Sequence, residues 1–290
     1  MPYTAKLQGI EKHYTSFTLG PVNWELPAGM IVGLVGENGA GKTTLLKMLC
    51  GALRPDAGQI ALWDTSPADA AARARIGAVF EDAFFPECFT ARQVGKCLRG
   101  VFGARWSDEK YNAYLHNFAL DGGKPIKEYS RGMRMKLSLA AALAHDPELL
   151  VLDEATSGLD PVVRGELLDL LLDYIQDERR TVLLSSHITT DLEQIADRIA
   201  YLHRGRLLFC EDKDELLQQY GLLRCAQGDL ARLPAGCAVY TRQGAYGCET
   251  LVKSRAPRAP PCRTPSATPP ELTILCALPV GGTTNEGLAL

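Results

Sequence analysis

The chain of 290 residues has 46% hydrophobic and 22% charged residues and a formal net charge of −3. This length accommodates one large α/β domain with a small appendage, or two modest domains. The weak acidic charge provides no basic field for wrapping nucleic acid, and no run approaches the roughly eighteen apolar residues of a membrane helix. The N-terminus also lacks the pattern of a signal peptide, so we expect a soluble, cytoplasmic protein that binds no nucleic acid.

The first part of the chain, up to about Asp64, is predicted to be an antiparallel β portion that leads into a phosphate-binding loop. Residues 31–35 form a short apolar strand, and residues 44–49 have the apolar spacing of a helix. Between them, residues 36–43 fit the pattern of a glycine, four free positions and then Gly-Lys-Thr. Backbone N–H groups of such a loop surround phosphate oxygens, Lys42 reaches the outer phosphates, and the Thr43 hydroxyl can ligate Mg²⁺. The sequence therefore predicts a nucleoside triphosphate site.

A second block, from about residue 82 to residue 147, is predicted to be largely helical. Phe84 and Phe85 lie near its start, where they serve either as an apolar docking surface or as part of the core. Nine cysteines are scattered along the chain without C-x-x-C pairs or metal-ligand spacing, which predicts reduced, mostly buried thiols. We expect Cys50, Cys88 and Cys97 to pack as small hydrophobic residues.

Polar side chains follow two further strands. The apolar run 149–152 ends in Asp153 and Glu154, and the apolar run 181–184 leads to Ser185, Ser186 and His187. Parallel strands deliver such residues to one carboxyl edge of a sheet. There Asp153 can orient Mg²⁺, Glu154 can accept a proton from attacking water, and His187 can contact the γ-phosphate. Residues 192–200 are predicted to form the last helix of this unit.

Taken with these residues, the segment around Ser130 shows that the chain resembles the ATP-binding subunit of an ABC transporter. In that family an aromatic residue, the phosphate loop, a Ser-x-Gly signature, the acidic strand, a Ser-Gly-Leu-Asp loop and a switch histidine follow in order. The counterparts here run from about residue 3 to about residue 219. The resemblance implies an ABC-type α/β fold with a mixed or parallel sheet, an antiparallel β subdomain and a helical subdomain.

The resemblance also assigns roles to individual residues. Tyr14 matches the aromatic residue that stacks on adenine, although an ordinary tyrosine on an early strand is the alternative. Ser130 and Gly132 match the signature, and Asp160 matches a residue acting across a dimer interface; both Ser130 and Asp160 are also suitable helix caps. The nucleotide site then comprises Tyr14, Gly36, Asn38, Gly39, Gly41, Lys42, Thr43, Thr44, Ser130, Gly132 and Asp160.

The sequence departs from the family pattern in two segments. Tyr129, Arg131 and Met133 replace three residues of the usual Leu-Ser-Gly-Gly-Gln, in a form that is similar to subunits paired with exporter-type membrane partners. Glu81 stands where the family usually carries glutamine. A carboxylate there can hold Mg²⁺ but adds negative charge beside the triphosphate, and the alternative is that it faces solvent or the membrane partner. We expect Thr43, Asp153 and Glu81 at the metal, and Glu154, His187 and Glu81 in catalysis.

The C-terminal part carries less information. We expect an ATP-binding domain over residues 1–220 and a small extension over residues 221–290. Within the extension, residues 222–251 form a small fold, residues 255–270 form a proline-rich linker, and residues 271–278 form a short ordered element. Four basic residues of this region lie in a solvated linker or contact lipid headgroups: Lys253, Arg255, Arg258 and Arg263.

The sequence therefore predicts an ATPase that dimerises over two ATP molecules with a second ATP-binding subunit. The resemblance implies that it powers transport, in the export direction, through a separate transmembrane permease at the inner face of the cell membrane. One alternative is a soluble ABC-type ATPase acting in repair or translation. A second alternative is a regulatory nucleotide switch that hardly hydrolyses ATP, and Glu154 and His187 disfavour it. A GTPase is disfavoured because no Asn-Lys-x-Asp or Thr-Lys-x-Asp motif is present.

Overall fold

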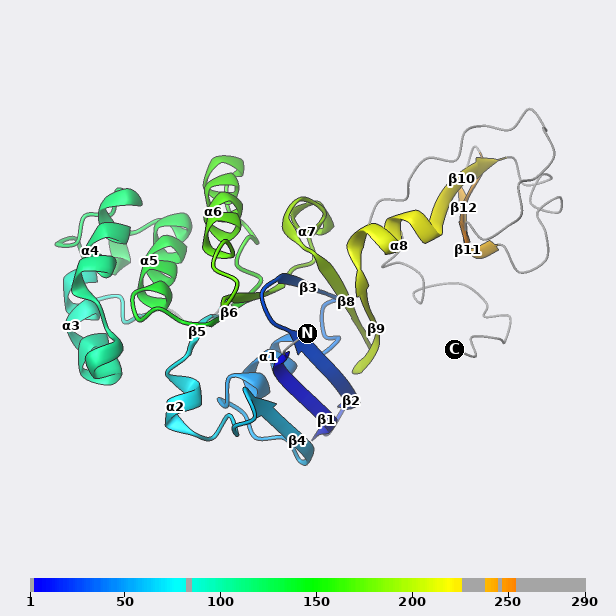
Figure 1. Cartoon of the computed structure of the whole chain (residues 1–290). Helices are drawn as coiled ribbons and strands as arrows, with labels where there is room; N and C mark the ends of the chain where they lie inside the picture. Colours follow the sequence, from blue (N-terminus) through cyan, green and yellow to red (C-terminus); the bar gives the residue numbers. More distant parts are fainter. Residues whose placement is uncertain (1–2, 82–84, 226–237, 245–246, 254–290) are drawn as a thin grey trace. The chain divides into compact units, whose positions relative to one another are not determined.

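The computed structural model describes residues 3–81, 85–225, 238–244 and 247–253, and it divides into two compact units, Met1–Cys210 and Glu211–Leu290 (Figure 1). The first unit contains β1 Tyr3–Tyr14, β2 Phe17–Pro27, β3 Ile31–Val35, α1 Lys42–Leu49, β4 Ala57–Leu62, α2 Ala70–Arg73, β5 Ile76–Val79, α3 Ala91–Phe102, η1 Gly103–Arg105, α4 Asp108–Asn117, η2 Ile126–Glu128, α5 Arg131–Leu143, β6 Leu149–Asp153, α6 Pro161–Tyr174, β7 Thr181–Ser185, α7 Thr189–Ile195 and β8 Arg198–His203. The remaining elements are β9 Arg206–Asp212, α8 Lys213–Gln219, β10 Tyr220–Cys225, β11 Ala238–Gly244 and β12 Gly247–Lys253.

A six-stranded sheet with the order β5-β6-β7-β3-β8-β9 forms the centre of the first unit. The pairs β5/β6, β6/β7, β7/β3 and β3/β8 are parallel. Strands β3, β6 and β7 are buried along their whole length, as expected for parallel strands covered on both faces. The predicted α/β class with a mixed sheet is confirmed, and the carboxyl ends of β3, β6 and β7 lie next to one another.

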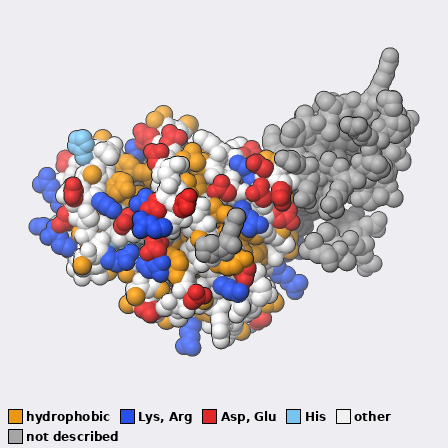
Figure 2. All heavy atoms as spheres, in the orientation of Figure 1, with side chains coloured by type: hydrophobic (Ala, Val, Ile, Leu, Met, Phe, Trp, Pro, Cys, Tyr) orange, Lys and Arg blue, Asp and Glu red, His pale blue; other side chains and the backbone are white. Residues whose placement is uncertain are grey.

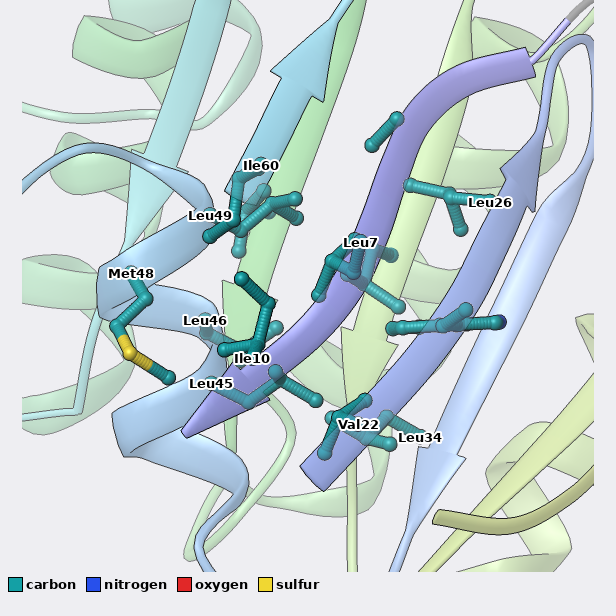
Figure 3. Close-up of a cluster of buried hydrophobic side chains, with 14 of the residues drawn as sticks. Leu7, Ile10, Val22, Leu26, Leu34, Leu45, Leu46, Met48, Leu49 and Ile60 are labelled. Atoms are coloured by element: carbon teal, nitrogen blue, oxygen red, sulfur yellow. The ribbon is translucent and has the colours of Figure 1, made fainter. Parts of the chain in front are cut away.

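A second, antiparallel sheet with the order β2-β1-β4 packs over helix α1 (Figure 3). Leu45, Leu46 and Leu49 of α1 share one buried cluster with Leu7 and Ile10 of β1. The same cluster includes residues of β3, β6 and β7, so α1 lies between the two sheets. This packing fixes the helix that begins directly after the phosphate-loop pattern.

The helices α3, α4 and α5 have their own apolar cluster, which contains Val94, Tyr111, Leu115 and Leu137. Helix α3 begins with a capping box, in which the Thr90 side chain accepts from the Gln93 backbone N–H and the Gln93 side chain accepts from Thr90. The predicted helical block is therefore observed from α3 to α5. Phe85 packs against this cluster, whereas Phe84 lies outside the described residues.

The second unit contains a three-stranded antiparallel sheet with the order β10-β12-β11. These strands lie between Tyr220 and Lys253 and so overlap the predicted small fold of residues 222–251. The segments 255–270 and 271–278, together with Arg255, Arg258 and Arg263, lie outside the described residues and stay predictions. The boundary at residue 220 also stays a prediction.

One predicted helix is wrong in part. Residues 192–200 were expected to be helical, but α7 ends at Ile195 and β8 begins at Arg198. Ala196 is already extended, and the Asp197 carboxylate accepts a hydrogen bond of 2.8 Å from the Ile31 backbone N–H at the start of β3. The apolar residues that follow pair with β3 in the sheet, so tertiary pairing overrides the helical spacing.

The surface of the first unit carries charges of both signs. Figure 2 shows Lys and Arg side chains interspersed with Asp and Glu side chains on the visible face. None of the helices in the part of the chain that the structure describes is long and apolar enough to cross a membrane.

In the part of the chain whose burial the structure describes, Cys50 and Cys210 are partly buried and Cys88 and Cys97 are exposed, which corrects the expectation that Cys50, Cys88 and Cys97 all pack as hydrophobic residues. Cys50 packs against the α1 cluster, and burial raises the pKa of its thiol to about 12. Cys88 and Cys97 are exposed free thiols. Cys88 precedes α3 and Cys97 lies within it, and neither belongs to the apolar cluster of α3, α4 and α5.

We predict that Cys88 and Cys97 react with iodoacetamide in the native protein at pH 8, whereas Cys50 does not. The thiolate is the reactive form, and a pKa of about 12 leaves almost none of it at Cys50. Peptide mapping by mass spectrometry after brief labelling measures this directly. Labelling of all three residues in urea provides the control, and native labelling of Cys50 as fast as Cys97 would contradict the assignment.

Candidate functional site

The loop of residues 36–41 connects β3 to α1 and is shaped by close backbone approach. A Cβ atom at Gly36 would lie 2.3 Å from the Leu202 carbonyl oxygen, so only glycine fits where the loop leaves the sheet. The next residues of the loop, Asn38 and Gly39, are exposed, and Gly41 is the N-cap of α1. Helix α1 therefore begins at Lys42, directly after the loop, with Thr44 in its first turn.

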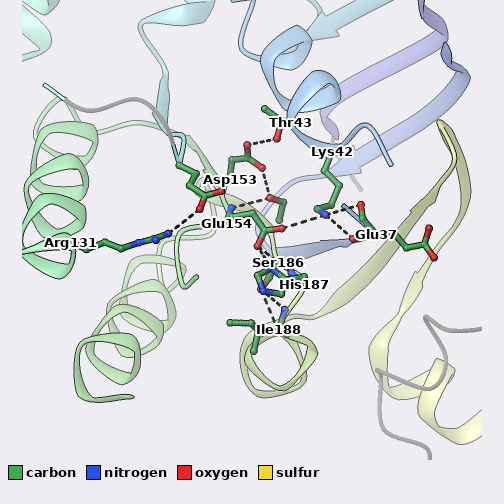
Figure 4. Close-up of polar contacts among 12 residues, drawn as sticks. Glu37, Lys42, Thr43, Arg131, Asp153, Glu154, Ser186, His187 and Ile188 are labelled. Carbon is green, nitrogen blue, oxygen red and sulfur yellow. Dashed lines mark hydrogen bonds and ion pairs between the residues drawn. The ribbon is translucent and has the colours of Figure 1, made fainter. Parts of the chain in front are cut away.

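Lys42 is buried, with its side chain 6% exposed, and its ammonium group points back into the loop (Figure 4). Its Nζ atom donates to the carbonyl oxygens of Gly36 at 2.7 Å and Glu37 at 3.3 Å. It also lies 3.4 Å from Oε1 of Glu154. A buried ammonium held by carbonyl oxygens and one carboxylate is positioned to exchange these partners for phosphate oxygens.

Asp153 lies at the end of β6 and is held from two sides by hydroxyl groups. Its Oδ2 accepts from the Thr43 hydroxyl and its Oδ1 accepts from the Ser185 hydroxyl, both at 2.6 Å. The Ser185 oxygen also accepts from the Glu154 backbone N–H at 3.1 Å. One hydroxyl at the end of β7 therefore contacts both Asp153 and the backbone of Glu154, whose N–H also donates to the Ser185 carbonyl oxygen at 3.1 Å.

Glu154 links Lys42, at the start of α1, to His187, which follows β7. Its Oε2 lies 2.6 Å from Nδ1 of His187, while its Oε1 faces Lys42. The residue is 9% exposed and adopts a φ of 52°, a left-handed conformation that is uncommon for a residue with a side chain. Such strain persists where the surroundings hold it, and it is frequent at functional sites.

The site residues predicted from the sequence fall into two groups. Lys42, Thr43, Asp153, Glu154 and His187 form one connected set of hydrogen bonds and ion pairs at the carboxyl edge of the sheet (Figure 4). The other group is made up of residues that no hydrogen bond or ion pair among the described residues joins to this set: Tyr14, Glu81, Ser130, Gly132 and Asp160.

Within the second group, two side chains cap helices, as the sequence allowed. The Ser130 hydroxyl accepts from the Met133 backbone N–H at 3.2 Å at the start of α5, and Asp160 accepts from Val162 and Val163 at the start of α6. Tyr14 ends β1 with 47% of its surface exposed and stacks on Phe17.

Two residues of the site were not identified from the sequence. Ser185 was placed at the sheet edge, but its bonds to both acids depend on the pairing of Asp153 opposite Ser185 in β6 and β7. Arg131 was noted only as a departure from the signature, yet its Nη2 donates to Oε1 of Glu81 at 2.9 Å. Strand register and a contact between residues fifty positions apart leave no local signal in a sequence.

Comparison with known proteins finds similarity to ATP-binding proteins of ABC transporters. A family model described as "ABC transporter" matches residues 19–157. An uncharacterised ABC transporter ATP-binding protein of Synechocystis is 36% identical over 69% of this chain and 58% of that protein. The bacitracin transport ATP-binding protein BcrA of Enterococcus faecalis is 33% identical, over 72% of this chain and 69% of the relative.

A third relative is the daunorubicin resistance ATP-binding protein DrrA3 of Streptomyces coeruleorubidus, which is 36% identical over 74% of this chain and 70% of the relative. Among solved structures, an "ATP binding subunit of ABC transporter" superposes with a TM-score of 0.67 at 26% identity. The superposition covers 74% of this chain and 92% of that structure. The matched region of this chain thus spans about three fifths of the first relative and most of the solved structure.

We predict that Ser185→Ala lowers the free energy of unfolding by about 1.5–3 kcal/mol, because the buried Asp153 carboxylate loses a hydrogen bond, whereas the Glu154 backbone N–H keeps the carbonyl oxygen of residue 185 as an acceptor. Ser186→Ala is the matched control. Its hydroxyl is equally buried but bonds only to the backbone of Ile188, so we expect a loss of about 0.5–1.5 kcal/mol. Urea denaturation followed by tryptophan fluorescence measures both. Equal losses in the two variants would contradict the role of Ser185.

Proposed function

The chain belongs to the ABC transporter family of ATP-binding proteins, and we propose that it binds Mg²⁺ and ATP on residues 36–43 and powers export through a separate membrane protein. The observation that carries this proposal is the position of Glu154. Its carboxylate lies between the Lys42 ammonium and the His187 ring, beside the loop that the sequence pattern assigns to phosphate. A carboxylate in that place is suited to activate water next to the terminal phosphate.

The side-chain oxygen atoms of Thr43 and Asp153 are suitable ligands for Mg²⁺. The Thr43 hydroxyl and the Asp153 carboxylate lie 2.6 Å apart, and both are hard oxygen ligands of the kind this ion prefers. Over the described residues, no three His, Cys, Asp or Glu side chains gather to hold a metal by themselves. That fits an ion bound by one or two protein oxygens together with the phosphates of its nucleotide. When bound, Mg²⁺ would supply positive charge that counters the charge developing on the phosphate oxygens.

The chain's own residues perform the other parts of hydrolysis. Lys42 binds the outer phosphates once its ammonium leaves the carbonyls of Gly36 and Glu37. Glu154 takes a proton from water, and His187 holds the Glu154 carboxylate in position through Nδ1. Tyr14, exposed at the end of β1, stacks on the adenine ring.

Ser130, Gly132 and Asp160 have no hydrogen bond or ion pair with the connected set around Lys42 among the described residues. This separation supports a site that is completed by a second ATP-binding subunit. Ser130 and Gly132 begin α5, whose N-terminus provides backbone donors and partial positive charge. In a head-to-tail dimer this end of the helix, together with Asp160, faces the nucleotide bound on the partner. Two nucleotides are then shared by two chains.

The membrane partner and the direction of transport rest on the relatives. One is named for bacitracin transport and another for daunorubicin resistance, and both names describe ATP-binding components. We place this chain accordingly at the inner face of the cell membrane, bound to a transmembrane permease. The alternative of a soluble ATPase in repair or translation is not favoured, because these relatives serve in transport and resistance.

We predict that Glu154→Gln retains ATP binding while turnover falls on the order of a hundredfold or more, since an amide cannot act as the general base. Phosphate release measures turnover, and titration with a fluorescent ATP analogue measures binding. Lys42→Ala provides the contrast, because it removes the charge partner of the phosphates and should weaken binding itself. Unchanged turnover in Glu154→Gln would refute the assignment of the base.

We also predict that ATP, but not ADP, shifts Glu154→Gln from monomer to dimer in analytical ultracentrifugation. The γ-phosphate is the group that the start of α5 on a partner chain would contact. Adding Ser130→Arg should abolish this shift and leave ATP binding by the monomer largely intact, because residues 36–43 are untouched.

The shared site would be refuted if the double variant dimerised like Glu154→Gln. It would equally be refuted if Ser130→Arg removed ATP binding from the monomer. If a neighbouring gene encodes a second ATP-binding subunit, that subunit should be included in the same experiment. A heterodimer would show the shift only with both chains present.

A further inference from the structure

Arg131 and Glu81, two of the residues at which the sequence departs from the family pattern, meet in the structure. Arg131 follows the signature serine, and Glu81 stands where the family usually carries glutamine. Their side chains form an ion pair, with Nη2 of Arg131 2.9 Å from Oε1 of Glu81 (Figure 4). The two residues are fifty positions apart, so only the fold brings them together.

Glu81 lies at the edge of the sheet that carries the catalytic acids. Strands β5 and β6 are parallel neighbours, and Val79 is paired with Leu152. β5 ends at Val79 and β6 at Asp153, and the same register continued by two residues brings Glu81 to the level of Glu154, with neighbouring strands only about 4.8 Å apart. The Glu81 carboxylate thus adds a third acid to the edge that already carries Asp153 and Glu154.

The Arg131 guanidinium touches a third segment as well. A Cβ atom built on Gly158 would lie 2.9 Å from the guanidinium carbon of Arg131, which places the guanidinium directly against the backbone of Gly158. Arg131 therefore lies between the end of β5 and the loop before α6, while its own backbone forms the first turn of α5.

This ion pair affects the local charge at the nucleotide edge more than the folding stability of the chain. Both side chains are about half exposed, 48% for Arg131 and 45% for Glu81, and exposed ion pairs contribute little to stability. A carboxylate at the nucleotide edge, however, repels a triphosphate, and an opposite charge within hydrogen-bond distance cancels most of that repulsion. Among the ion pairs of the described residues, Lys42 faces Glu154, and Arg131 is the cation that faces Glu81.

We propose that Arg131 is a positioning residue for the ATPase reaction, whose ion pair with Glu81 neutralises the third acid of the nucleotide edge and holds the start of α5 against the end of β5. The inference rests on the ATP site proposed above. It means that Glu81 and Arg131 function as a matched pair: each is tolerated because the other is present. A carboxylate at position 81 is then compatible with triphosphate binding in this chain.

A double-mutant cycle tests the pairing through KM and kcat for MgATP in the full chain. Arg131→Gln should raise KM about tenfold, which corresponds to about 1.4 kcal/mol, while kcat changes less, because an unpaired carboxylate opposes binding of the anion. Glu81→Gln should stay within about tenfold of the parent, since the amide keeps an oxygen at that position. Combining the two should return KM to within about threefold of Glu81→Gln.

Two controls separate electrostatics from structural damage. The defect of Arg131→Gln should shrink as salt is raised, because exposed charges are screened, and Arg131→Lys should recover most of the affinity. Glu87→Gln removes a neighbouring ion pair of the same length, formed with Arg134 one turn further along α5, and should leave KM unchanged.

The pairing would be overturned if Arg131→Gln left KM unchanged, or if the double variant were as impaired as Arg131→Gln alone. Either result in a parent protein that hydrolyses ATP would refute this inference and leave the proposed function standing. A parent that neither binds nor hydrolyses MgATP, with Lys42→Ala indistinguishable from it, would refute both.

Discussion

The parallel pairing of β7 between β6 and β3 determines where every polar group of the site lies. Because all three strands run in one direction, the phosphate loop after β3, the acids at the end of β6 and the histidine after β7 reach the same edge. The pairing of Asp153 with Ser185 sets their relative height, which lets one hydroxyl bond to Asp153 and to the Glu154 backbone. Packing of α1 between the two sheets then fixes Lys42 and Thr43 opposite these acids.

The side chains at this edge form one connected set of contacts at the place where we propose that the nucleotide binds. Lys42 and His187 face Glu154 from two sides, and Thr43 and Ser185 hold Asp153. Buried charges are stable only when they are paired, so these contacts stabilise the site before any phosphate is bound. They also preorganise it, because the groups that we propose to act on phosphate and water already lie in one connected network.

The parts of this account that sequence could predict are those with a local signal. The loop around Lys42, the strands that end at Asp153 and Ser185 and the capping by Ser130 follow from glycine spacing, apolar runs and residue type, and the structure has them at those places. Residues 196–200 were misassigned because pairing with β3 decides their conformation. The contact between Arg131 and Glu81 depends on two distant segments, so composition and spacing could not reveal it.

The most direct test of the central claim is a crystal structure of Glu154→Gln with Mg²⁺ and ATP. The account predicts that Nζ of Lys42 leaves the carbonyl oxygens of Gly36 and Glu37 for phosphate oxygens, and that residue 154 stays beside His187 and faces the γ-phosphate. It also predicts that Ser130 of a second copy lies on the opposite side of that phosphate. A nucleotide bound elsewhere, with Lys42 still hydrogen-bonded to Gly36, would contradict the account.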